Sequence, residues 1–144
     1  MSMRTPSKRA TAAGWTAGAI MTPQPVTIGR KETLATAHRL MRKHRIRHLP
    51  VLEHGELVGL VTQRDLFLVE SILGVDDETD LVEDAFSTDT YAVTPDTPIA
   101  GVARHMMRNH FGCAVVMERA RVIGIFTVTD ALRLVSALAP TAGA

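Results

Sequence analysis

The chain has 144 residues, of which 46% are hydrophobic and 22% are charged. Its length indicates roughly one domain of about 100–200 residues, and its composition is that of an ordinary soluble globular protein. Because 16 Lys and Arg residues stand against 15 Asp and Glu residues, the net charge does not indicate nucleic acid or a membrane surface as the partner.

The sequence also lacks the usual targeting and redox signals. The basic residues Arg4, Lys8 and Arg9 are not followed by the apolar run of a secretory signal. No segment approaches the ~20 apolar residues of a membrane span. The single cysteine, Cys113, excludes an intrachain disulfide and a multi-cysteine zinc site. We therefore expect a cytoplasmic protein with no membrane association.

The first half of the chain shows a regular order of predicted elements. Residues 1–14 are small, polar and basic without periodicity, which predicts a disordered arm. Residues 32–44 carry apolar side chains at spacings of three and four, which predicts a helix. Two strands, residues 48–53 and 56–61, flank a His-Gly turn and form a predicted hairpin. A second helix, residues 65–73, is apolar on nearly all sides.

The second half repeats the first with a shift of 65 residues and no gap. Identical residues in the two copies are Ala35 and Ala100, Arg39 and Arg104, Met41 and Met106, Val51 and Val116, Glu53 and Glu118, Gly59 and Gly124, Thr62 and Thr127, and Asp65 and Asp130. We assign the repeats to residues 15–73 and 85–139. The acidic segment between them, residues 74–84, is interpreted as a solvated linker, and residues 140–144 form a C-terminal tail.

This repeated unit resembles the CBS domain, named for cystathionine β-synthase, and the tandem resembles a CBS pair, or Bateman module. The resemblance covers about residues 15–138 and rests on four segments: Ile20-Met21-Thr22-Pro23, residues 34–41, Arg47-His48-Leu49-Pro50-Val51, and Gly59-Leu60-Val61-Thr62-Gln63-Arg64-Asp65. It implies an α/β (α+β) fold in which each repeat has a mostly three-stranded sheet and two helices. It also implies that the repeats pack as a pseudo-two-fold pair, with clefts that take adenosyl ligands.

The Thr-x-x-Asp corner of each repeat has two interpretations. In the functional one, Asp65 accepts hydrogen bonds from both hydroxyls of a ribose, and Thr62 donates to ribose or phosphate beside the free N–H groups of a helix N-terminus. In the structural one, Thr62 and Asp65 form a capping box that stabilises the helix by ~1 kcal/mol. The two roles are compatible for Thr62, and the resemblance favours ligand contact for Asp65.

In the first repeat, the predicted ligand site combines an early strand, the basic run before Leu-Pro-Val and the Thr-x-x-Asp corner. Its residues are Val26, Thr27, Ile28, Arg47, His48, Leu49, Pro50, Thr62, Arg64 and Asp65. The resemblance implies that the basic pair contacts phosphates, and several cations suit a mono- to triphosphate. A solvated basic face is the alternative.

The second repeat departs from this pattern. Its predicted site residues are Tyr91, Ala92, Val93, Cys113, Ala114, Thr127, Thr129 and Asp130. Gly112 and Cys113 stand in place of the basic pair, and Thr129 stands in place of Arg64. We therefore expect this site to take a less anionic ligand, such as an adenosyl group without a polyphosphate, or to stay empty.

Neither catalysis nor metal binding is expected from the sequence. There is no Walker loop, dinucleotide fingerprint or Gly-x-Ser-x-Gly motif, and no nucleophile stands near a base. The six histidines show no paired-ligand spacing. No cofactor is required, and an adenine nucleotide is the expected regulatory ligand.

We interpret the chain as a stand-alone regulatory CBS pair that binds AMP, ADP or ATP at the first repeat and signals to an unknown partner protein. The apolar helices at 65–73 and 130–139 predict a homodimer. Three alternatives remain: a ligand-independent interaction and dimerisation module, a binder of S-adenosylmethionine or NAD, and a nucleic-acid binder. The near-zero net charge argues against the last.

Overall fold

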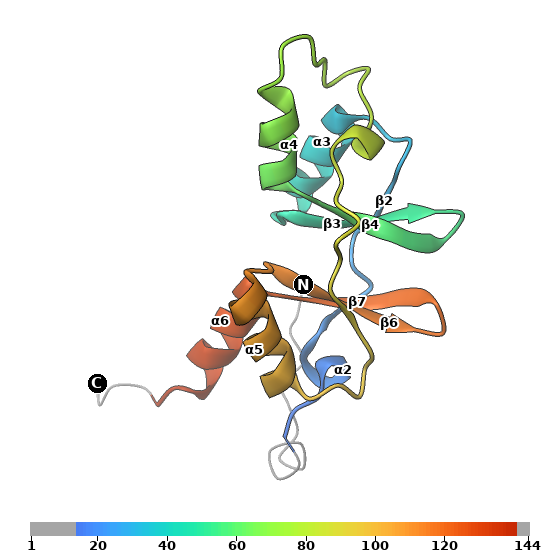
Figure 1. Ribbon diagram of the computed structural model, residues 1–144. Coiled ribbons are helices and arrows are strands. Elements are labelled where there is room, and N and C mark those ends of the chain that lie inside the picture. Colours follow the sequence, from blue (N-terminus) through green and yellow to red (C-terminus); the bar gives the residue numbers. More distant parts are fainter. Residues whose placement is uncertain (1–13, 141–144) are drawn as a thin grey trace. The chain divides into compact units, whose positions relative to one another are not determined.

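The computed structural model describes residues 14–140 of the chain. Apart from residues 14 and 140, the predicted arm and tail lie outside the described residues. Helices and two small β-sheets make up the described part (Figure 1), which confirms the expected α/β class. No helix in this part is long and apolar enough to cross a membrane.

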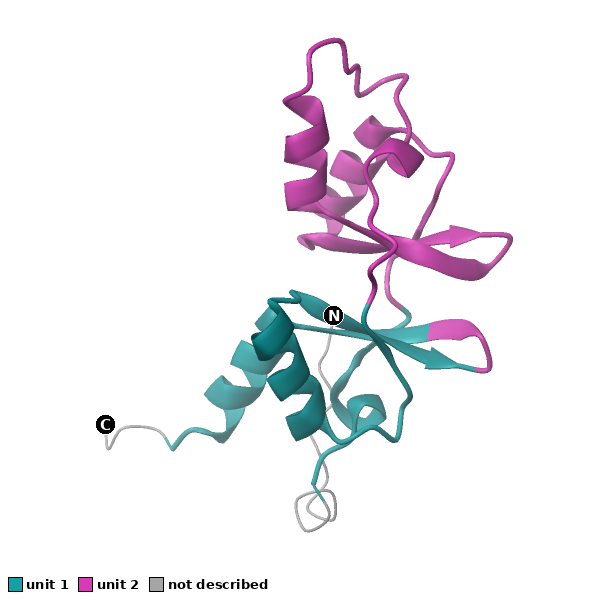
Figure 2. Ribbon diagram, in the orientation of Figure 1, with its two compact units in different colours: residues 1–24, 91–118, 123–144 teal, residues 25–90, 119–122 magenta. Residues whose placement is uncertain are grey.

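The chain divides into two compact units, coloured separately in Figure 2. Unit 1 comprises residues 1–24, 91–118 and 123–144, and unit 2 comprises residues 25–90 and 119–122. These boundaries differ from those of the sequence repeats. Unit 1 includes the first residues of the first repeat, and unit 2 includes the acidic segment, the first residues of the second repeat and residues 119–122.

Unit 2 contains a three-stranded sheet with strand order β2-β3-β4. The short strand β2 (Ile28–Gly29) runs parallel to β3 (His48–Glu53), and β3 runs antiparallel to β4 (Glu56–Thr62). The predicted hairpin is confirmed: His54 and Gly55 form its turn with φ angles of 51° and 79°. Two successive positive φ angles match the twist of a two-residue hairpin.

Helices α3 (Leu34–His44) and α4 (Gln63–Glu70) complete unit 2 together with a 3₁₀ turn, η1 (Val82–Asp84). The side chain of Thr33 caps α3 by accepting the N–H of Thr36 at 3.1 Å. The apolar side chains of α3 pack on the sheet in one core: Ile28, Leu34, Ala37, Met41, Leu49, Val51, Val61, Leu66 and Val82.

Helix α4 ends three residues earlier than the predicted helix 65–73. Ser71 Oγ donates to the carbonyl oxygen of Leu68 at 2.6 Å, and Gly74 has a φ of 93°, so the helical backbone does not continue. The predicted linker that follows is only partly solvated. Val82 is fully buried in the unit 2 core, and its N–H donates to the carbonyl of Glu32 at 2.8 Å.

Unit 1 contains a four-stranded sheet with strand order β1-β7-β6-β5. Its strands are β1 (Thr22–Pro23), β5 (Ala92–Val93), β6 (Cys113–Glu118) and β7 (Arg121–Thr127), and its helices are α2 (Ala17–Ile20), α5 (Ile99–Asn109) and α6 (Val128–Leu138). Its core is formed by Ala17, Ile20, Val93, Ile99, Val102, Met106, Ala114, Val116 and Phe126.

The repeats exchange the segments that lead into them. Strand β1 lies at the start of the first repeat, yet it pairs with β7 of the second, with Thr22 opposite Ile125. Conversely, Ser87 precedes β5 of the second repeat and pairs with Leu60 on β4 of the first. Two backbone hydrogen bonds of 2.9 Å join Leu60 and Ser87. Each sheet is therefore completed by residues from outside its own repeat.

The two repeated glycines lie where these exchanged segments cross the sheets. A Cβ atom at Gly59 would overlap the Phe86 ring and the Ser87 carbonyl oxygen, and one at Gly124 would overlap the side chain of Met21. Glycine therefore permits the close approach of a second chain segment at each position.

Candidate functional site

The first Thr-x-x-Asp corner forms the start of α4. The N–H of Thr62 donates to Asp65 Oδ2 at 2.9 Å, and the N–H of Asp65 donates to Thr62 Oγ1 at 3.1 Å. The capping box that the sequence allows is therefore present. Within residues 14–140, Asp65 Oδ1 has no hydrogen-bond partner, and the side chain is half-buried. The cap thus uses one carboxylate oxygen and leaves the other available.

The second corner forms the start of α6 in the same way but adds further contacts. Asp130 Oδ2 accepts from the N–H of Thr127 at 2.9 Å and from its hydroxyl at 3.1 Å. Asp130 Oδ1 accepts from the hydroxyl of Thr22 at 3.1 Å and lies 3.6 Å from Nη1 of Arg133. Asp130 is only 3% exposed. Both of its oxygens are therefore already engaged within the protein.

The basic run of the first repeat lies at the same end of the sheet as the Thr62 corner. His48 is opposite Thr62 in the β3–β4 register, and the N–H of Gln63 donates to the Arg47 carbonyl at 2.9 Å. Arg47 and Arg64 are exposed and His48 is half-buried. These groups therefore lie at one edge of the sheet, with the two arginines open to solvent, and their role in ligand binding stays a prediction.

The electrostatic environment distinguishes His48 from the arginines beside it. Burial lowers the pKa of His48, the neighbouring Arg47 charge lowers it further, and the Asp65 carboxylate opposes the shift. At neutral pH the positive charge at this edge therefore comes from the arginines, while neutral His48 offers one donor and one acceptor nitrogen.

The other predicted residues of the first site differ in accessibility. Val26 and Thr27 lie just before β2 and are half-buried. Ile28 and Leu49 belong to the unit 2 core, and Pro50 is fully buried. Because the side chains of these last three residues are buried, any ligand contact from them would use their backbone atoms.

The predicted residues of the second site all lie in unit 1. Tyr91 is half-buried next to β5, while Ala92 and Thr129 are exposed. Val93, Cys113 and Ala114 are buried. Burial raises the pKa of the Cys113 thiol to about 12, so the sulfur behaves as a small apolar group.

An aromatic stack adjoins the second site. The Tyr91 ring lies 4.1 Å from the His105 ring and 6.0 Å from the Phe111 ring, measured between centroids. Burial raises the pKa of Tyr91. Neither His105 nor Phe111 is among the predicted site residues, because they come from α5 and the loop after it and share no local motif with Tyr91.

The CBS domain family model matches residues 17–71 and 78–137 of the chain. The chain spans only 29% and 22% of the length of the first two curated relatives it matches.

Several solved structures have the same fold. An acetoin utilization protein (AcuB) from Vibrio cholerae superposes with a TM-score of 0.80, is 29% identical, and the match covers 87% of this chain and 93% of that one. CBSX2, solved in complex with AMP, gives a TM-score of 0.76 at 25% identity over 88% of this chain and 100% of its own. The CBS domain pair of protein MJ0100 was solved with 5′-methylthioadenosine and S-adenosyl-L-methionine. It gives a TM-score of 0.73 at 25% identity, and the match covers 85% of this chain and 96% of that one.

Proposed function

Because this chain belongs to the CBS domain family and carries two such domains in tandem, we propose that it is a regulatory module that binds an adenine nucleotide, AMP, ADP or ATP. The ligand sits at the corner where β4 passes into α4. Asp65 holds the ribose, Thr62 and the first N–H groups of α4 lie beside it, and Arg47 and Arg64 attract the phosphates.

The observation that carries this proposal is the difference between the two carboxylates. Asp65 keeps Oδ1 free of partners within the described chain, whereas Asp130 is buried with both oxygens engaged by Thr22 and Thr127. A ribose diol needs acceptors that are not already used. The first corner meets this requirement, and the second would have to break a buried hydrogen bond.

The charges around the first corner support an anionic ligand. Arg47 and Arg64 are exposed, and within residues 14–140 neither forms an ion pair with a carboxylate. His48 has a lowered pKa, so it serves as a neutral hydrogen-bond donor until a phosphate stabilises its protonated form. In the second repeat, Gly112 and Thr129 stand at the positions of Arg47 and Arg64, which supports a less anionic ligand there.

Relatives support the adenosyl class more strongly than one particular nucleotide. CBSX2 is solved with AMP, and the MJ0100 pair is solved with 5′-methylthioadenosine and S-adenosyl-L-methionine. These ligands share adenine and ribose and differ in charge. Two exposed arginines favour a phosphorylated ligand over S-adenosylmethionine. NAD, which carries two phosphates, competes with the adenine nucleotides on this criterion.

Thermal-shift titration of the wild-type chain against AMP, ADP, ATP, NAD and S-adenosylmethionine tests the ligand class. A ligand that binds only the folded state raises the melting temperature, and we expect the adenine nucleotides to do so. The decisive variant is Asp65→Asn, because its amide oxygen can still accept the Thr62 N–H while its NH₂ group cannot accept a ribose hydroxyl. We expect at least about tenfold weaker AMP binding, the loss of one hydrogen bond to a charged group.

Two controls separate the ribose role from general charge effects. Asp89→Asn removes the same charge from an exposed position and should leave AMP affinity unchanged. Replacing AMP by its 2′-deoxy analogue should weaken binding to the wild type but not to Asp65→Asn. If Asp65→Asn binds AMP like the wild type, the ribose assignment is wrong; if no nucleotide raises the melting temperature, the ligand assignment fails altogether.

The expected consequence of binding is a change in the conformational balance of the module, which a regulated partner protein detects. No group in the first corner is arranged for nucleophilic or acid–base chemistry on a bound nucleotide, so we propose a non-catalytic role. Capture experiments with and without nucleotide would identify the partner protein.

A second candidate, a ligand-independent interaction module, is favoured by exposed apolar side chains on two helices. Phe67 and Leu68 on α4 are 57% and 58% exposed, and Leu132 and Val135 on α6 are 64% and 62% exposed. A homodimer in which these helices meet would remove them from water. Light scattering at micromolar concentration should give twice the chain mass; a monomer at all concentrations would rule the homodimer out.

A further inference from the structure

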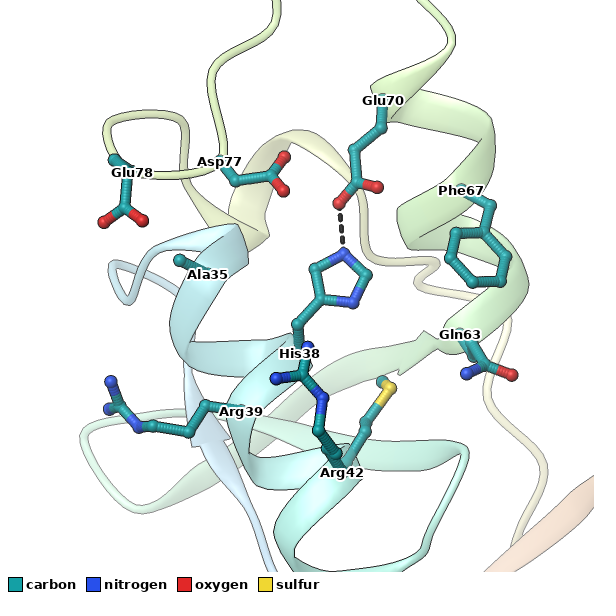
Figure 3. A pocket seen from close by; sticks show the side chains of 10 residues that line it. Ala35, His38, Arg39, Arg42, Gln63, Phe67, Glu70, Asp77 and Glu78 are labelled. Carbon is teal, nitrogen blue, oxygen red and sulfur yellow. Dashed lines mark hydrogen bonds and ion pairs between the residues drawn. The ribbon is translucent and has the colours of Figure 1, made fainter.

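A pocket of about 710 Å³ lies on unit 2 between α3, α4 and the acidic segment after α4 (Figure 3). None of the residues assigned to the nucleotide lines it. Three potential metal ligands project into it from three different parts of the chain: His38 from α3, Glu70 from the last turn of α4, and Asp77 from the acidic segment.

The three donor atoms are close enough to share one ion. One ligand atom each from His38, Glu70 and Asp77 lies within 4.8 Å of the other two, and all three residues are half-buried. His38 Nε2 already contacts Glu70 Oε1 (Figure 3). Ligands of a tetrahedral zinc ion, at about 2.1 Å from the metal, lie roughly 3.4 Å apart. Small side-chain adjustments would therefore bring the donors into coordination.

The contact between His38 and Glu70 does not explain why the Asp77 carboxylate also lies at the pocket. The backbone carbonyl of Asp77 accepts the N–H of Ala35 at 2.9 Å, which ties the acidic segment to the first turn of α3. In the part of the chain that the structure describes, the Asp77 carboxylate itself has no hydrogen bond or ion pair. Figure 3 shows it on the Glu70 side of the imidazole. The backbone thus holds a free carboxylate at the pocket.

Among the described residues, the carboxylates of Glu70 and Asp77 have no arginine partner in the pocket. Glu70 and Asp77 are like charges at short range, which repel unless a cation lies between them. Arg39 and Arg42 also line the pocket, but within residues 14–140 neither forms an ion pair with these carboxylates. In Figure 3 the Arg39 guanidinium extends away from both. A divalent ion would neutralise the pair and satisfy Asp77.

We propose that His38, Glu70 and Asp77 form a binding site for a divalent transition metal, with Zn²⁺ as the representative ion. An imidazole with two carboxylates suits Zn²⁺, Co²⁺ or Mn²⁺, whereas Mg²⁺ and Ca²⁺ prefer all-oxygen sites. Three protein ligands leave a coordination position that faces the pocket. The ion would join α3 to α4 and to the acidic segment that follows α4 in the chain.

The test measures Zn²⁺ binding to tag-free protein by competition with a chromogenic chelator, together with the visible absorption of the Co²⁺ complex. We expect one equivalent of metal and a rise in melting temperature on Zn²⁺ addition. His38→Gln, Glu70→Gln and Asp77→Asn should each weaken binding by at least about tenfold, since even outer-shell changes cost that much. His44→Gln, on the same helix, and Glu78→Gln, on the same segment, should bind like the wild type.

The Asp77→Asn variant keeps the test valid if loss of the His38 contact to Glu70 disturbs the fold, because its side chain has no partner to lose. Its circular dichroism spectrum and metal-free melting temperature should match those of the wild type. The proposal is overturned by a chain that takes up no stoichiometric metal, by unchanged affinity in Asp77→Asn, or by equal losses in His44→Gln and Glu78→Gln.

Discussion

Substitution of Gly59 by alanine should destabilise the protein although it adds a single methyl group. Gly59 lies on β4 at the point where residues 86 and 87 cross the strand. Its new Cβ would overlap both the Phe86 ring and the carbonyl oxygen of Ser87. The ring can rotate, but the carbonyl is backbone and is held by two hydrogen bonds to Leu60. The crossing segment therefore has to move.

The expected cost combines three contributions. Forcing an extra methyl group into a packed site costs about 1–3 kcal/mol. Displacing Ser87 weakens two backbone hydrogen bonds, each worth about 0.5–1.5 kcal/mol. Alanine restricts the unfolded chain more than glycine does, and this effect stabilises the folded protein by about 0.4–1 kcal/mol. We therefore expect the free energy of unfolding to fall by about 2–3 kcal/mol, a balance of these ranges.

Two other glycines provide matched comparisons. A Cβ at Gly124 would overlap only the side chain of Met21, which is flexible and can move, so Gly124→Ala should cost less than Gly59→Ala. Gly101 lies in α5 with no atom within 4 Å of a Cβ built there. Gly101→Ala should therefore stabilise the protein by about 0.5–1 kcal/mol through helix propensity.

Urea unfolding followed by circular dichroism measures all three variants under the same conditions, with the midpoint and the slope fitted separately. The expected order of stability is Gly101→Ala, wild type, Gly124→Ala and then Gly59→Ala. The reasoning is refuted if Gly59→Ala is as stable as the wild type, or if Gly124→Ala loses more than Gly59→Ala.

Three further outcomes are expected. Thr22→Val should lower the free energy of unfolding by about 1.5–3 kcal/mol, because it removes a hydrogen bond to the buried Asp130 carboxylate, whereas the exposed Thr129→Val should have little effect; urea unfolding decides between them. The pKa of His48 is lowered in the folded chain, so the unfolded chain binds the proton first as pH falls. The free energy of unfolding should therefore decline as pH falls below about 6.5. His48→Gln should flatten that decline between pH 7.5 and 5.5, and an unchanged slope would contradict the burial argument. The Cys113 thiol, with its pKa raised to about 12, should react with a disulfide reagent more than about 100-fold more slowly in the native chain than in urea, and rapid native labelling would show that the site is open.

Local patterns in the sequence were sufficient to predict much of the fold. The spacing of Leu34, Ala37 and Met41 predicts α3, and His54-Gly55 predicts the β3–β4 hairpin, because both depend on residues close together in the chain. The same holds for the start of α4, where Thr62 and its partner three residues later form the predicted cap. The ligand roles of these corner residues remain proposals.

Features that depend on distant residues were not predictable in this way. Thr22 and Asp130 are 108 residues apart, so nothing local distinguishes Asp130 from its counterpart Asp65. The lowered pKa of His48 depends on burial, which a basic run in the sequence does not reveal. The proximity of His38, Glu70 and Asp77 gives no local spacing signal for the same reason, because His38 and Asp77 belong to different elements and meet only in the folded unit.

The exchange of leading segments between the two repeats affects how such a chain can be divided. A fragment cut at the repeat boundary, residues 15–73, keeps β1 without β7 and keeps β4 without Ser87. In such a fragment the β1 segment and the outer edge of β4 would expose unpaired backbone groups, and exposed strand edges favour aggregation. The pair, and not the single repeat, is therefore the smallest segment in which both sheets keep their pairing partners.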